Sequence, residues 1–298
     1  MFPGEMKPGR SMSQTGIPPF SEANSAEMVA QRLLKAKAGP LPRFLAVVVD
    51  HLHQIVRETR PTAADWRQAI AFLTEIGHAC DDKRQEWVLL SDLLGVTALV
   101  EDINSRRPNG ATPNTGRGPF YRPDAPRLPH GADISLDRAG APLIVSGRVT
   151  DLDGMPIAGA MVETWQANAQ GFYENQQPDL QPEYNLRGVF ITDRDGRFHY
   201  RTVKPDGYGV PDDGPVGQML GRLNYPLSRP AHIHFLIRAD NFETLTTQVF
   251  DRADPRLDQD ALFGVKPELV GDFMRSSTGD GWSLDYSFVM AMARKGAA

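Results

Sequence analysis

The spacing of apolar residues changes once along this chain, and that change limits the folds open to it. Between residues 25 and 107, four segments carry apolar residues at the 3.6-residue spacing of amphipathic helices. After a stretch rich in Pro, Gly and Asn, seven short segments show a period of two, with turn signals between them, as in a β-sandwich. The pattern predicts an α+β protein with a helical domain at 25–107 and a β-sandwich domain at 108–298.

The same spacing predicts the individual elements. Helices are expected at 25–36, 42–58, 62–79 and 83–105. Thr62 and Asp65 have the spacing of a capping box, which predicts a helix start there. Strands are expected at 142–151, 160–168, 189–193, 197–203, 231–239, 244–250 and 283–291. Residues 1–24 show no periodicity and are rich in Pro, Gly and Ser, so we expect a mobile N-terminal arm.

Composition limits the partners and the compartment. The 298 residues carry a net charge of -5 without a stripe of Lys and Arg, which argues against nucleic acid and favours a small-molecule partner. The single cysteine, Cys80, cannot form an internal disulfide, and the N-terminal residues lack the apolar core of a secretory signal. No apolar run reaches the roughly 18 residues of a membrane span. We expect a cytoplasmic protein that does not enter a membrane.

The motif RPAHIHF at 229–235 places two imidazoles two positions apart in a predicted strand. Residues at that spacing share a face of a strand, so His232 and His234 should converge while Ile233 and Phe235 point the other way. This geometry suits two ligands of one metal ion, although a strand that carries two histidines without a metal is an equal alternative. His51 and His53 have the same spacing in a predicted helix, where such side chains diverge.

Two imidazoles leave a metal ion short of ligands. Carboxylates are the usual additional ligands, but the segments before the histidines stand out for tyrosines in Gly- and Pro-rich contexts. Tyr173 lies in GFYEN, and Tyr208 lies in PDGYGVP. Taken alone, each is more simply a packing or hydrogen-bonding residue.

Several blocks in order resemble the intradiol ring-cleavage dioxygenases, non-haem iron(III) enzymes that split a catechol ring between its two hydroxylated carbons. The blocks are VLLSDLLGVTALV, GPFYRPDAP, GRVTDLDGMPIAGAMVETWQAN, GFY, PDGYGVPDDGPVG, RPAHIHF, TTQVF and GVKPELVGDF. The resemblance covers most of the chain, is strongest to the hydroxyquinol and chlorocatechol branch, and implies one Fe(III) per chain. The implied iron ligands are Tyr173, Tyr208, His232 and His234, and the implied non-ligands are Tyr184, Tyr200 and Tyr225.

The resemblance also implies roles around the metal. Tyr208 would leave the metal when substrate binds, and its basicity would help to take up a proton of the diol. Arg229 would place a permanent positive charge near the ring, and Gln248 would hydrogen-bond within the site. From the residues alone, Arg229 could equally end a strand at the surface, and Gln248 could satisfy backbone groups.

By the same resemblance, the last predicted helix, the GPFY loop and the turn after Tyr208 form the ring pocket. The corresponding residues are Leu89, Asp92, Gly118, Pro119, Phe120, Val210 and Pro211. A carboxylate such as Asp92 needs a partner in a ring pocket, and a third ring hydroxyl would supply one. We therefore expect hydroxyquinol (benzene-1,2,4-triol) and O2 as substrates and 3-hydroxy-cis,cis-muconate or its tautomer maleylacetate as product, in the catabolism of aromatic compounds.

Alternatives stay open at this point. Catechol or a chlorocatechol would give cis,cis-muconate or its chlorinated form, Asp92 could face solvent or cap a turn, and Arg117 stands where relatives often carry an apolar residue. A non-catalytic β-sandwich module that binds a ligand, or a copper or zinc site on the same histidines, would be rival interpretations. The resemblance further implies a homodimer formed through the helical domain, with a phospholipid as a possible ligand of its interface.

Overall fold

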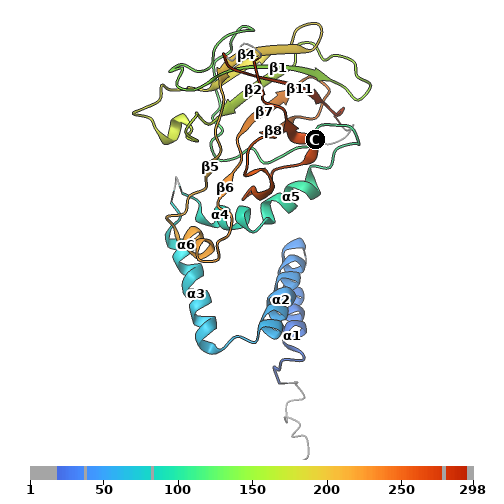
Figure 1. Cartoon of the computed structure of the whole chain (residues 1–298). Coiled ribbons are helices and arrows are strands. Elements are labelled where there is room, and N and C mark those ends of the chain that lie inside the picture. Colours follow the sequence, from blue (N-terminus) through green and yellow to red (C-terminus); the bar gives the residue numbers. More distant parts are fainter. Residues whose placement is uncertain (1–18, 37–38, 82–83, 277–279, 294–298) are drawn as a thin grey trace, which may run out of the picture. The chain divides into compact units, whose positions relative to one another are not determined.

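The computed structural model describes residues 19–36, 39–81, 84–276 and 280–293 (Figure 1). Most of the predicted arm, residues 1–18, lies outside the described residues. The chain divides between Leu73 and Thr74 into two compact units, and the division falls inside a helix. The domain limits 25–107 and 108–298 therefore stay a prediction.

The first unit contains α1 (Ser25–Ala36), α2 (Pro40–Thr59) and most of α3 (Ala63–His78), close to the predicted helices. The capping box is confirmed, because Thr62 N donates to Asp65 Oδ2 at 2.9 Å and Asp65 N donates to Thr62 Oγ1 at 3.2 Å. On α2, the Nδ1 atom of His53 lies 2.9 Å from Ser25 Oγ, while His51 is exposed. These two histidines therefore do not form a ligand pair.

The second unit includes the end of α3, followed by α4 (Glu86–Leu93) and α5 (Val96–Asn104). The sequence predicts one helix over 83–105, and this expectation is wrong because the helix breaks at Gly95. Gly95 has a φ of 72°, a left-handed conformation that only glycine adopts without steric penalty. Ser91 Oγ and Thr97 Oγ1 lie 2.8 Å apart across the break. The apolar spacing continues through it, so periodicity alone does not reveal it.

All seven predicted strands are present within one or two residues of their expected ends. They are β1 (Pro142–Thr150), β2 (Met161–Gln166), β3 (Arg187–Ile191), β4 (Arg197–Val203), β7 (His232–Arg238), β8 (Leu245–Asp251) and β11 (Trp282–Val289). Four further strands of two residues each are too short to show alternation. They are β5 (Tyr208–Gly209), β6 (Ser228–Arg229), β9 (Val270–Gly271) and β10 (Met274–Arg275).

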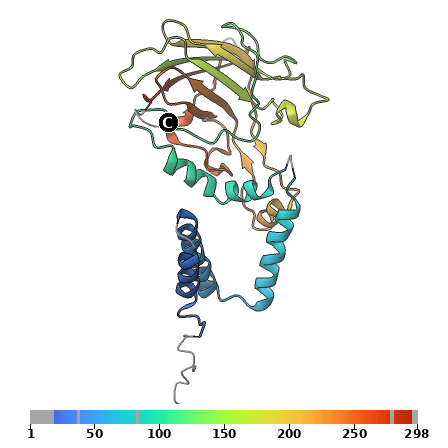
Figure 2. The ribbon, with the colours of Figure 1, turned by 180° about the vertical axis from the view of Figure 1, so that it is seen from behind.

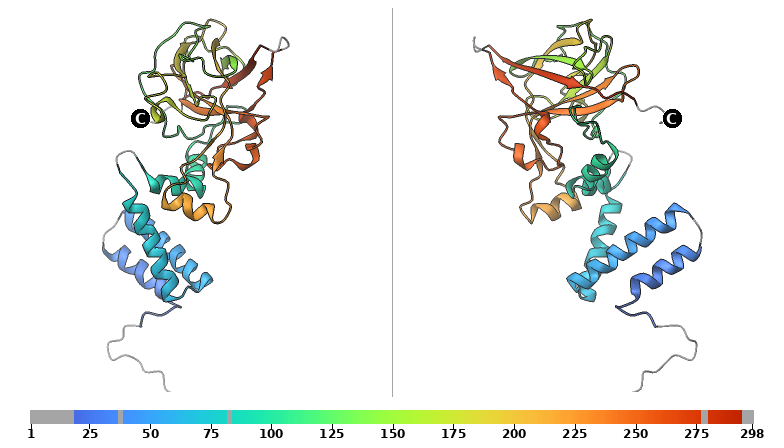
Figure 3. Two further views of the ribbon diagram at one scale, coloured as in Figure 1. Left: turned by 60° about the vertical axis from the view of Figure 1, so that its left-hand side comes forward. Right: turned by 90° about the vertical axis from the view of Figure 1, so that its right-hand side faces the viewer.

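The strands form a β-sandwich, as the sequence predicts. One sheet has the order β10-β11-β1-β4, the other has the order β3-β2-β7-β8-β9, and β5 pairs separately with β6. The first sheet is mixed, since β1 runs parallel to β11 and antiparallel to β4. At one end of the sandwich, α4 and α5 lie together with α6 (Pro215–Gly221) in each view (Figure 1; Figure 2; Figure 3).

Strand β7 contributes to two different environments. Ile233, Phe235 and Ile237 belong to the buried core between the sheets, where they meet side chains of β1, β4 and β11. The alternate residues face outward, where Leu236 packs with Trp165 and Tyr173 in a smaller cluster. The outer face of the five-stranded sheet is therefore also covered, and the site described next lies there. Among the described residues, no helix is both long and apolar enough to span a membrane.

A candidate metal centre and substrate cavity

The two imidazoles of β7 converge as the alternation predicts. The Nε2 atoms of His232 and His234 lie 3.2 Å apart, and both side chains are buried. Ile233 and Phe235 point into the core instead. The predicted sharing of one face is therefore confirmed, and it places two ring nitrogens at one point on the outer face of the sheet.

The hydrogen bonds determine which nitrogen is available in His232. Its Nδ1 lies 2.7 Å from the carbonyl oxygen of Pro230, which can only accept, so Nδ1 carries the proton. Burial and the charge of Arg229 lower the pKa of His232 to about 3. Burial and the neighbouring His232 lower the pKa of His234 well below its usual value. Both rings are therefore neutral near pH 7, and Nε2 of His232 carries a lone pair that faces Nε2 of His234.

Trp165 holds the second imidazole in place. In the register of β2 and β7 it lies opposite His234, and the two rings stack with centroids 4.7 Å apart. On the other side, Gln248 of β8 is paired with His234 in register. The sheet itself thus fixes the orientation of this ring.

Tyr173 approaches the imidazoles from the loop after β2, directly before the short helix η1 (Glu174–Gln176). Its side chain is fully buried, its ring stacks on Phe120 at 4.5 Å, and its centroid is 6.3 Å from that of His234. Burial, followed by the nearby Tyr208, raises the pKa of Tyr173 well above its usual value. Its hydroxyl has no hydrogen-bond partner among the described residues. A buried polar atom of this kind is unfavourable unless something else binds it.

Tyr208 completes the group of aromatic rings. The β5–β6 pairing places it opposite Arg229, and its ring centroid lies 5.8 Å from that of Tyr173 and 5.6 Å from that of His232. The two tyrosine loops can approach each other because Gly171 has no side chain: a Cβ there would lie 2.8 Å from the carbonyl oxygen of Gly207. The structure therefore brings the four expected ligands together in a closed ring of neighbours.

The three tyrosines that are expected not to bind the metal contact other residues. Tyr200 is in the core, where its hydroxyl lies 2.9 Å from Thr164 Oγ1. The Tyr225 hydroxyl donates to the carbonyl oxygen of Leu93 at 2.8 Å, and Tyr184 lies beneath the guanidinium of Arg122.

Arg229 is buried beside the imidazoles and is not a surface residue at a strand end. Its Nε and Nη2 donate to the carboxylate of Asp260 at 2.9 and 3.2 Å, and Nη2 also donates to Gln248 Oε1 at 2.8 Å. Gln248 in turn donates to the carbonyl oxygen of Gly116 at 3.1 Å. Burial alone would lower the pKa of Arg229, but Tyr208 and Asp260 raise it above its ordinary value, so the guanidinium keeps its charge.

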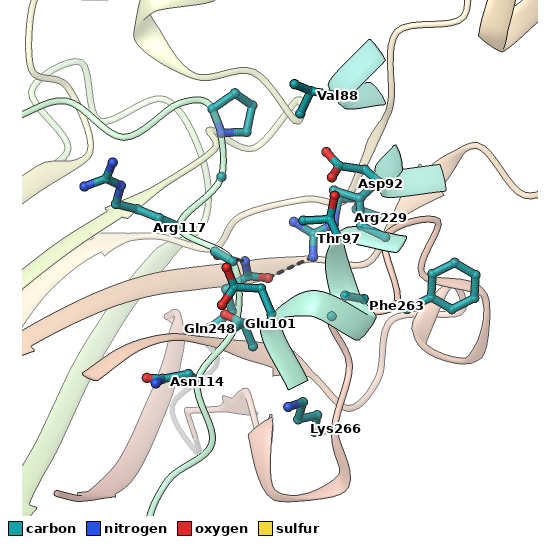
Figure 4. A pocket seen from close by; sticks show the side chains of 17 residues that line it. Val88, Asp92, Thr97, Glu101, Asn114, Arg117, Arg229, Gln248, Phe263 and Lys266 are labelled. Atoms are coloured by element: carbon teal, nitrogen blue, oxygen red, sulfur yellow. Dashed lines mark hydrogen bonds between the residues drawn. The ribbon is translucent and has the colours of Figure 1, made fainter. Parts of the chain in front are cut away.

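A cavity of about 380 Å³ opens beside Arg229 and Gln248. In Figure 4, Asp92, Thr97 and Arg229 lie side by side, while Lys266 and Asn114 lie at the other end. Burial raises the pKa of Asp92, and a hydrogen bond with Thr97 and the charge of Arg229 offset part of this rise. The walls are formed by Val88, Asp92, Thr97, Ala98, Glu101, Asn114, Thr115, Gly116, Arg117, Gly118, Pro119, Arg229, Gln248, Leu262, Phe263, Gly264 and Lys266.

Three of the seven expected pocket residues, Asp92, Gly118 and Pro119, line this cavity. Leu89 does not line it: Val88 does, because it lies one helical turn before Asp92 and shares its face. The remaining three lie elsewhere: Phe120 packs on Tyr173, Val210 is buried, and Pro211 is exposed. Contact of any of the seven with substrate stays a prediction.

Sequence reasoning missed several residues that shape the site. Trp165 stacks on His234, and Asp260 accepts a hydrogen bond from the guanidinium of Arg229. Thr97 forms a hydrogen bond with Asp92. Only Trp165 carried a signal, since it lies in a predicted strand that can pair with the HIH strand. Asp260 lies in a segment without periodicity, so nothing in the pattern links it to Arg229.

Comparison with known proteins defines the family. Residues 117–293 match the family described as "Dioxygenase", and residues 42–112 match "Catechol dioxygenase N terminus". The chain belongs to the intradiol ring-cleavage dioxygenases. It is 47% identical over 283 residues to a hydroxyquinol 1,2-dioxygenase of Rhizobium sp., covering 91% of this chain and 96% of that protein. It is 45% identical to a 6-chlorohydroxyquinol 1,2-dioxygenase of Cupriavidus pinatubonensis, covering 91% and 98%.

A solved structure of a hydroxyquinol 1,2-dioxygenase from Pseudomonas putida is similar to this dioxygenase, with a TM-score of 0.86 and 38% identity. It covers 91% of this chain and 99% of the other. The predicted resemblance and the class of enzyme are thereby confirmed. The alternative of a non-catalytic binding module is not supported, since the chain is a ring-cleavage dioxygenase of aromatic diols.

Proposed function

We propose that this intradiol dioxygenase holds one ferric ion between Tyr173, Tyr208, His232 and His234 and cleaves hydroxyquinol with O2. The product is 3-hydroxy-cis,cis-muconate or its tautomer maleylacetate. The proposal rests on the buried hydroxyl of Tyr173, which has no hydrogen-bond partner among the described residues. It lies beside two neutral imidazoles whose Nε2 atoms are 3.2 Å apart.

The four side chains fit a ferric ion. Two lone pairs of imidazole nitrogens at 3.2 Å repel each other unless a proton or a cation lies between them. The buried phenol of Tyr173 does not ionise by itself near pH 7, but a bound cation favours the deprotonated form of its ligands. Phenolate is a hard, anionic oxygen donor, which suits a trivalent iron better than zinc or copper. A bound ferric ion would act as a Lewis acid that lowers the pKa of the diol.

The protein residues around the ion account for the remaining steps. Tyr208, which is only half-buried, is the residue proposed to take up a proton from the diol as substrate enters. Arg229 stabilises the negative charge that the ring gains when the diol loses its protons. Gln248 fixes the guanidinium, with its own amide held by the carbonyl oxygen of Gly116.

The cavity favours a triol over a diol. An engineered cavity of roughly 150 Å³ is enough to bind benzene, so about 380 Å³ leaves room for ring substituents. Asp92 is more than half buried beside this space, and a third ring hydroxyl would give its carboxylate a hydrogen bond that catechol lacks. Relatives at 47% and 45% identity are named for hydroxyquinol and 6-chlorohydroxyquinol, so a chlorinated hydroxyquinol is the second candidate.

The test uses purified protein. Metal analysis should find one iron per chain, and the protein should be red from charge transfer between tyrosinate and Fe(III). Oxygen uptake should be fastest with hydroxyquinol, slower with a chlorinated hydroxyquinol and slowest with catechol. A colourless protein that contains zinc, copper or no metal and consumes no O2 with any of these compounds would refute the proposal.

We further propose a cytoplasmic homodimer formed through the helical residues 25–107, with a phospholipid as a ligand of the interface. Support comes from α2, which has no buried residue but exposes Phe44, Val47 and Ile55. A cavity of about 610 Å³ in the first unit is lined mainly by apolar side chains, together with Arg57, Arg60, Glu22, Ser25 and His53, and Glu22 pairs with Arg60 at 2.6 Å. Mass determination by light scattering and mass spectrometry of extracted lipid test these points: a monomer, or a protein free of lipid, would contradict them.

A further inference from the structure

The Arg229 guanidinium is oriented by a carboxylate outside the group of proposed ligands. Asp260 accepts from Nε at 2.9 Å and from Nη2 at 3.2 Å, and the two side chains are 3% and 4% exposed. Two parallel hydrogen bonds fix both the position and the plane of a guanidinium. Asp260 therefore determines the direction of the remaining N–H groups.

Counting these N–H groups shows which nitrogen is free for substrate. Asp260 occupies Nε–H and one N–H of Nη2, and Gln248 Oε1 occupies the other at 2.8 Å. Among the described residues, the one hydrogen-bonding neighbour of Nη1 is Nε2 of His232, at 3.5 Å. In the proposed function, the lone pair of that Nε2 binds the metal. Nη1 is thus the donor left for a ligand in the adjoining cavity, which Arg229 lines.

Asp260 does not line the cavity itself, but it is hydrogen-bonded to a segment of the cavity wall. Its carboxylate accepts from the backbone N–H of Gly264 at 2.8 Å, and Leu262, Phe263 and Gly264 all line the cavity. Phe263 has a φ of 55°, an unfavourable conformation for a bulky residue that its surroundings must stabilise. Gly264 leaves room for the ion pair, because a Cβ there would lie 2.8 Å from Nη2 of Arg229. One carboxylate thus links the guanidinium to the wall.

We propose that Asp260 is a positioning residue, which holds Arg229 so that Nη1 faces the bound ring and balances its charge in the buried site. This inference rests on the proposed function. If Asp260 acts by positioning Arg229, its replacement should affect turnover only when Arg229 is present. If Asp260 only stabilises the loop that contains Gly264, its replacement should have the same effect with and without Arg229.

A double-mutant cycle tests the inference with Asp260→Asn, Arg229→Gln and the variant that carries both changes. Asp260→Asn should lower kcat/KM for hydroxyquinol by about 10- to 100-fold, as expected for a displaced catalytic group. In the Arg229→Gln background the same change should alter kcat/KM by less than about threefold. The double variant also removes the unpaired buried cation that could prevent Asp260→Asn from folding. Glu163→Gln is the matched control, since Glu163 is a buried carboxylate paired with Arg238 and does not contact Arg229.

Two measurements that do not depend on turnover complete the test. Anaerobic titration with hydroxyquinol, followed by visible absorption, should show weaker binding for Asp260→Asn, and a crystal structure of that variant should show Arg229 displaced. Equal losses in both backgrounds, or an Asp260→Asn enzyme that behaves like Glu163→Gln, would overturn the inference. A wild-type protein without iron or oxygen uptake would instead overturn the proposed function, and the inference with it; an active wild type with an additive cycle overturns the inference alone.

Discussion

Replacing Tyr173 with Phe should stabilise the metal-free protein while it removes iron binding. The hydroxyl of Tyr173 is buried and has no partner among the described residues, so in the absence of metal it only contributes a desolvation penalty. An unsatisfied buried polar group of this kind costs about 1–3 kcal/mol. Phe keeps the ring that stacks on Phe120 at 4.5 Å. We therefore expect the free energy of unfolding of the metal-free protein to rise by about 1 kcal/mol, or roughly 2–4 °C in Tm.

Tyr200→Phe is the matched control with the opposite sign. Its hydroxyl is equally buried but is 2.9 Å from Thr164 Oγ1, so the change removes a hydrogen bond. A loss of about 0.5–1.5 kcal/mol is expected, with iron content and red colour unchanged. Urea unfolding of chelator-treated protein, followed by circular dichroism, measures both variants. If metal-free Tyr173→Phe were destabilised as much as Tyr200→Phe, or if it still bound iron with the wild-type spectrum, the reasoning would be refuted.

Three other changes address the cavity, the imidazoles and the guanidinium. Asp92→Ala should lower the preference for hydroxyquinol over catechol about 10-fold or more, because a hydrogen bond to a charged group contributes about 1.5–3 kcal/mol; an unchanged ratio of kcat/KM would exclude this contact. The free energy of unfolding of the metal-free protein should fall as the pH falls from 7 to 5. Burial lowers the pKa of His232 to about 3 in the folded state. Below pH 6.5 the unfolded chain therefore binds more protons than the folded protein does. The free energy of unfolding should change by up to about 1.4 kcal/mol per pH unit for each buried imidazole. Denaturation of His232→Gln at several pH values should show a smaller change per pH unit; an equal change would contradict the claim that buried His232 is neutral in the folded state. Gly264→Ala should reduce kcat/KM about 10-fold, since its Cβ would meet Arg229 Nη2 at 2.8 Å. Gly221→Ala should not, because a Cβ there would meet no described atom within 4 Å outside its own helix backbone and chain neighbours; equal activities of the two variants would show that the contact with Arg229 is relieved without consequence.

The strands and half of the proposed ligand set follow from sequence patterns. Alternation in AHIHFLIRA predicts both the strand and the shared face of His232 and His234, because a strand has a strict period of two. No periodicity points to Tyr173 or Tyr208, which lie outside the long strands. Only the resemblance to a family links these tyrosines to the histidines. In the structure, the ring centroids of the two tyrosines lie 5.8 Å apart.

The parts that could not be predicted depend on single backbone conformations and long-range contacts. The break between α4 and α5 depends on the left-handed φ of Gly95, while the apolar spacing on both sides continues as in one helix. The pairing of Arg229 with Asp260 joins residues 31 positions apart in a segment of turns. Neither feature has a periodic signature, and both determine which side chains line the cavity.

The sheet and the loops have different parts in the site. Strand register fixes Trp165, His234 and Gln248 in one row across β2, β7 and β8, so this row belongs to the same hydrogen-bonded sheet that covers the core. The tyrosines and the guanidinium come from the loop after β2 and from the short β5–β6 pair, which touch each other only because glycine at 171 permits it. Residues on a sheet can hold an ion in fixed geometry, whereas a half-buried loop tyrosine such as Tyr208 can move with little disturbance to the core. The proposed function requires both properties, because the site would keep its metal while Tyr208 makes room for a diol, and the sheet and the loops supply them from separate parts of the fold.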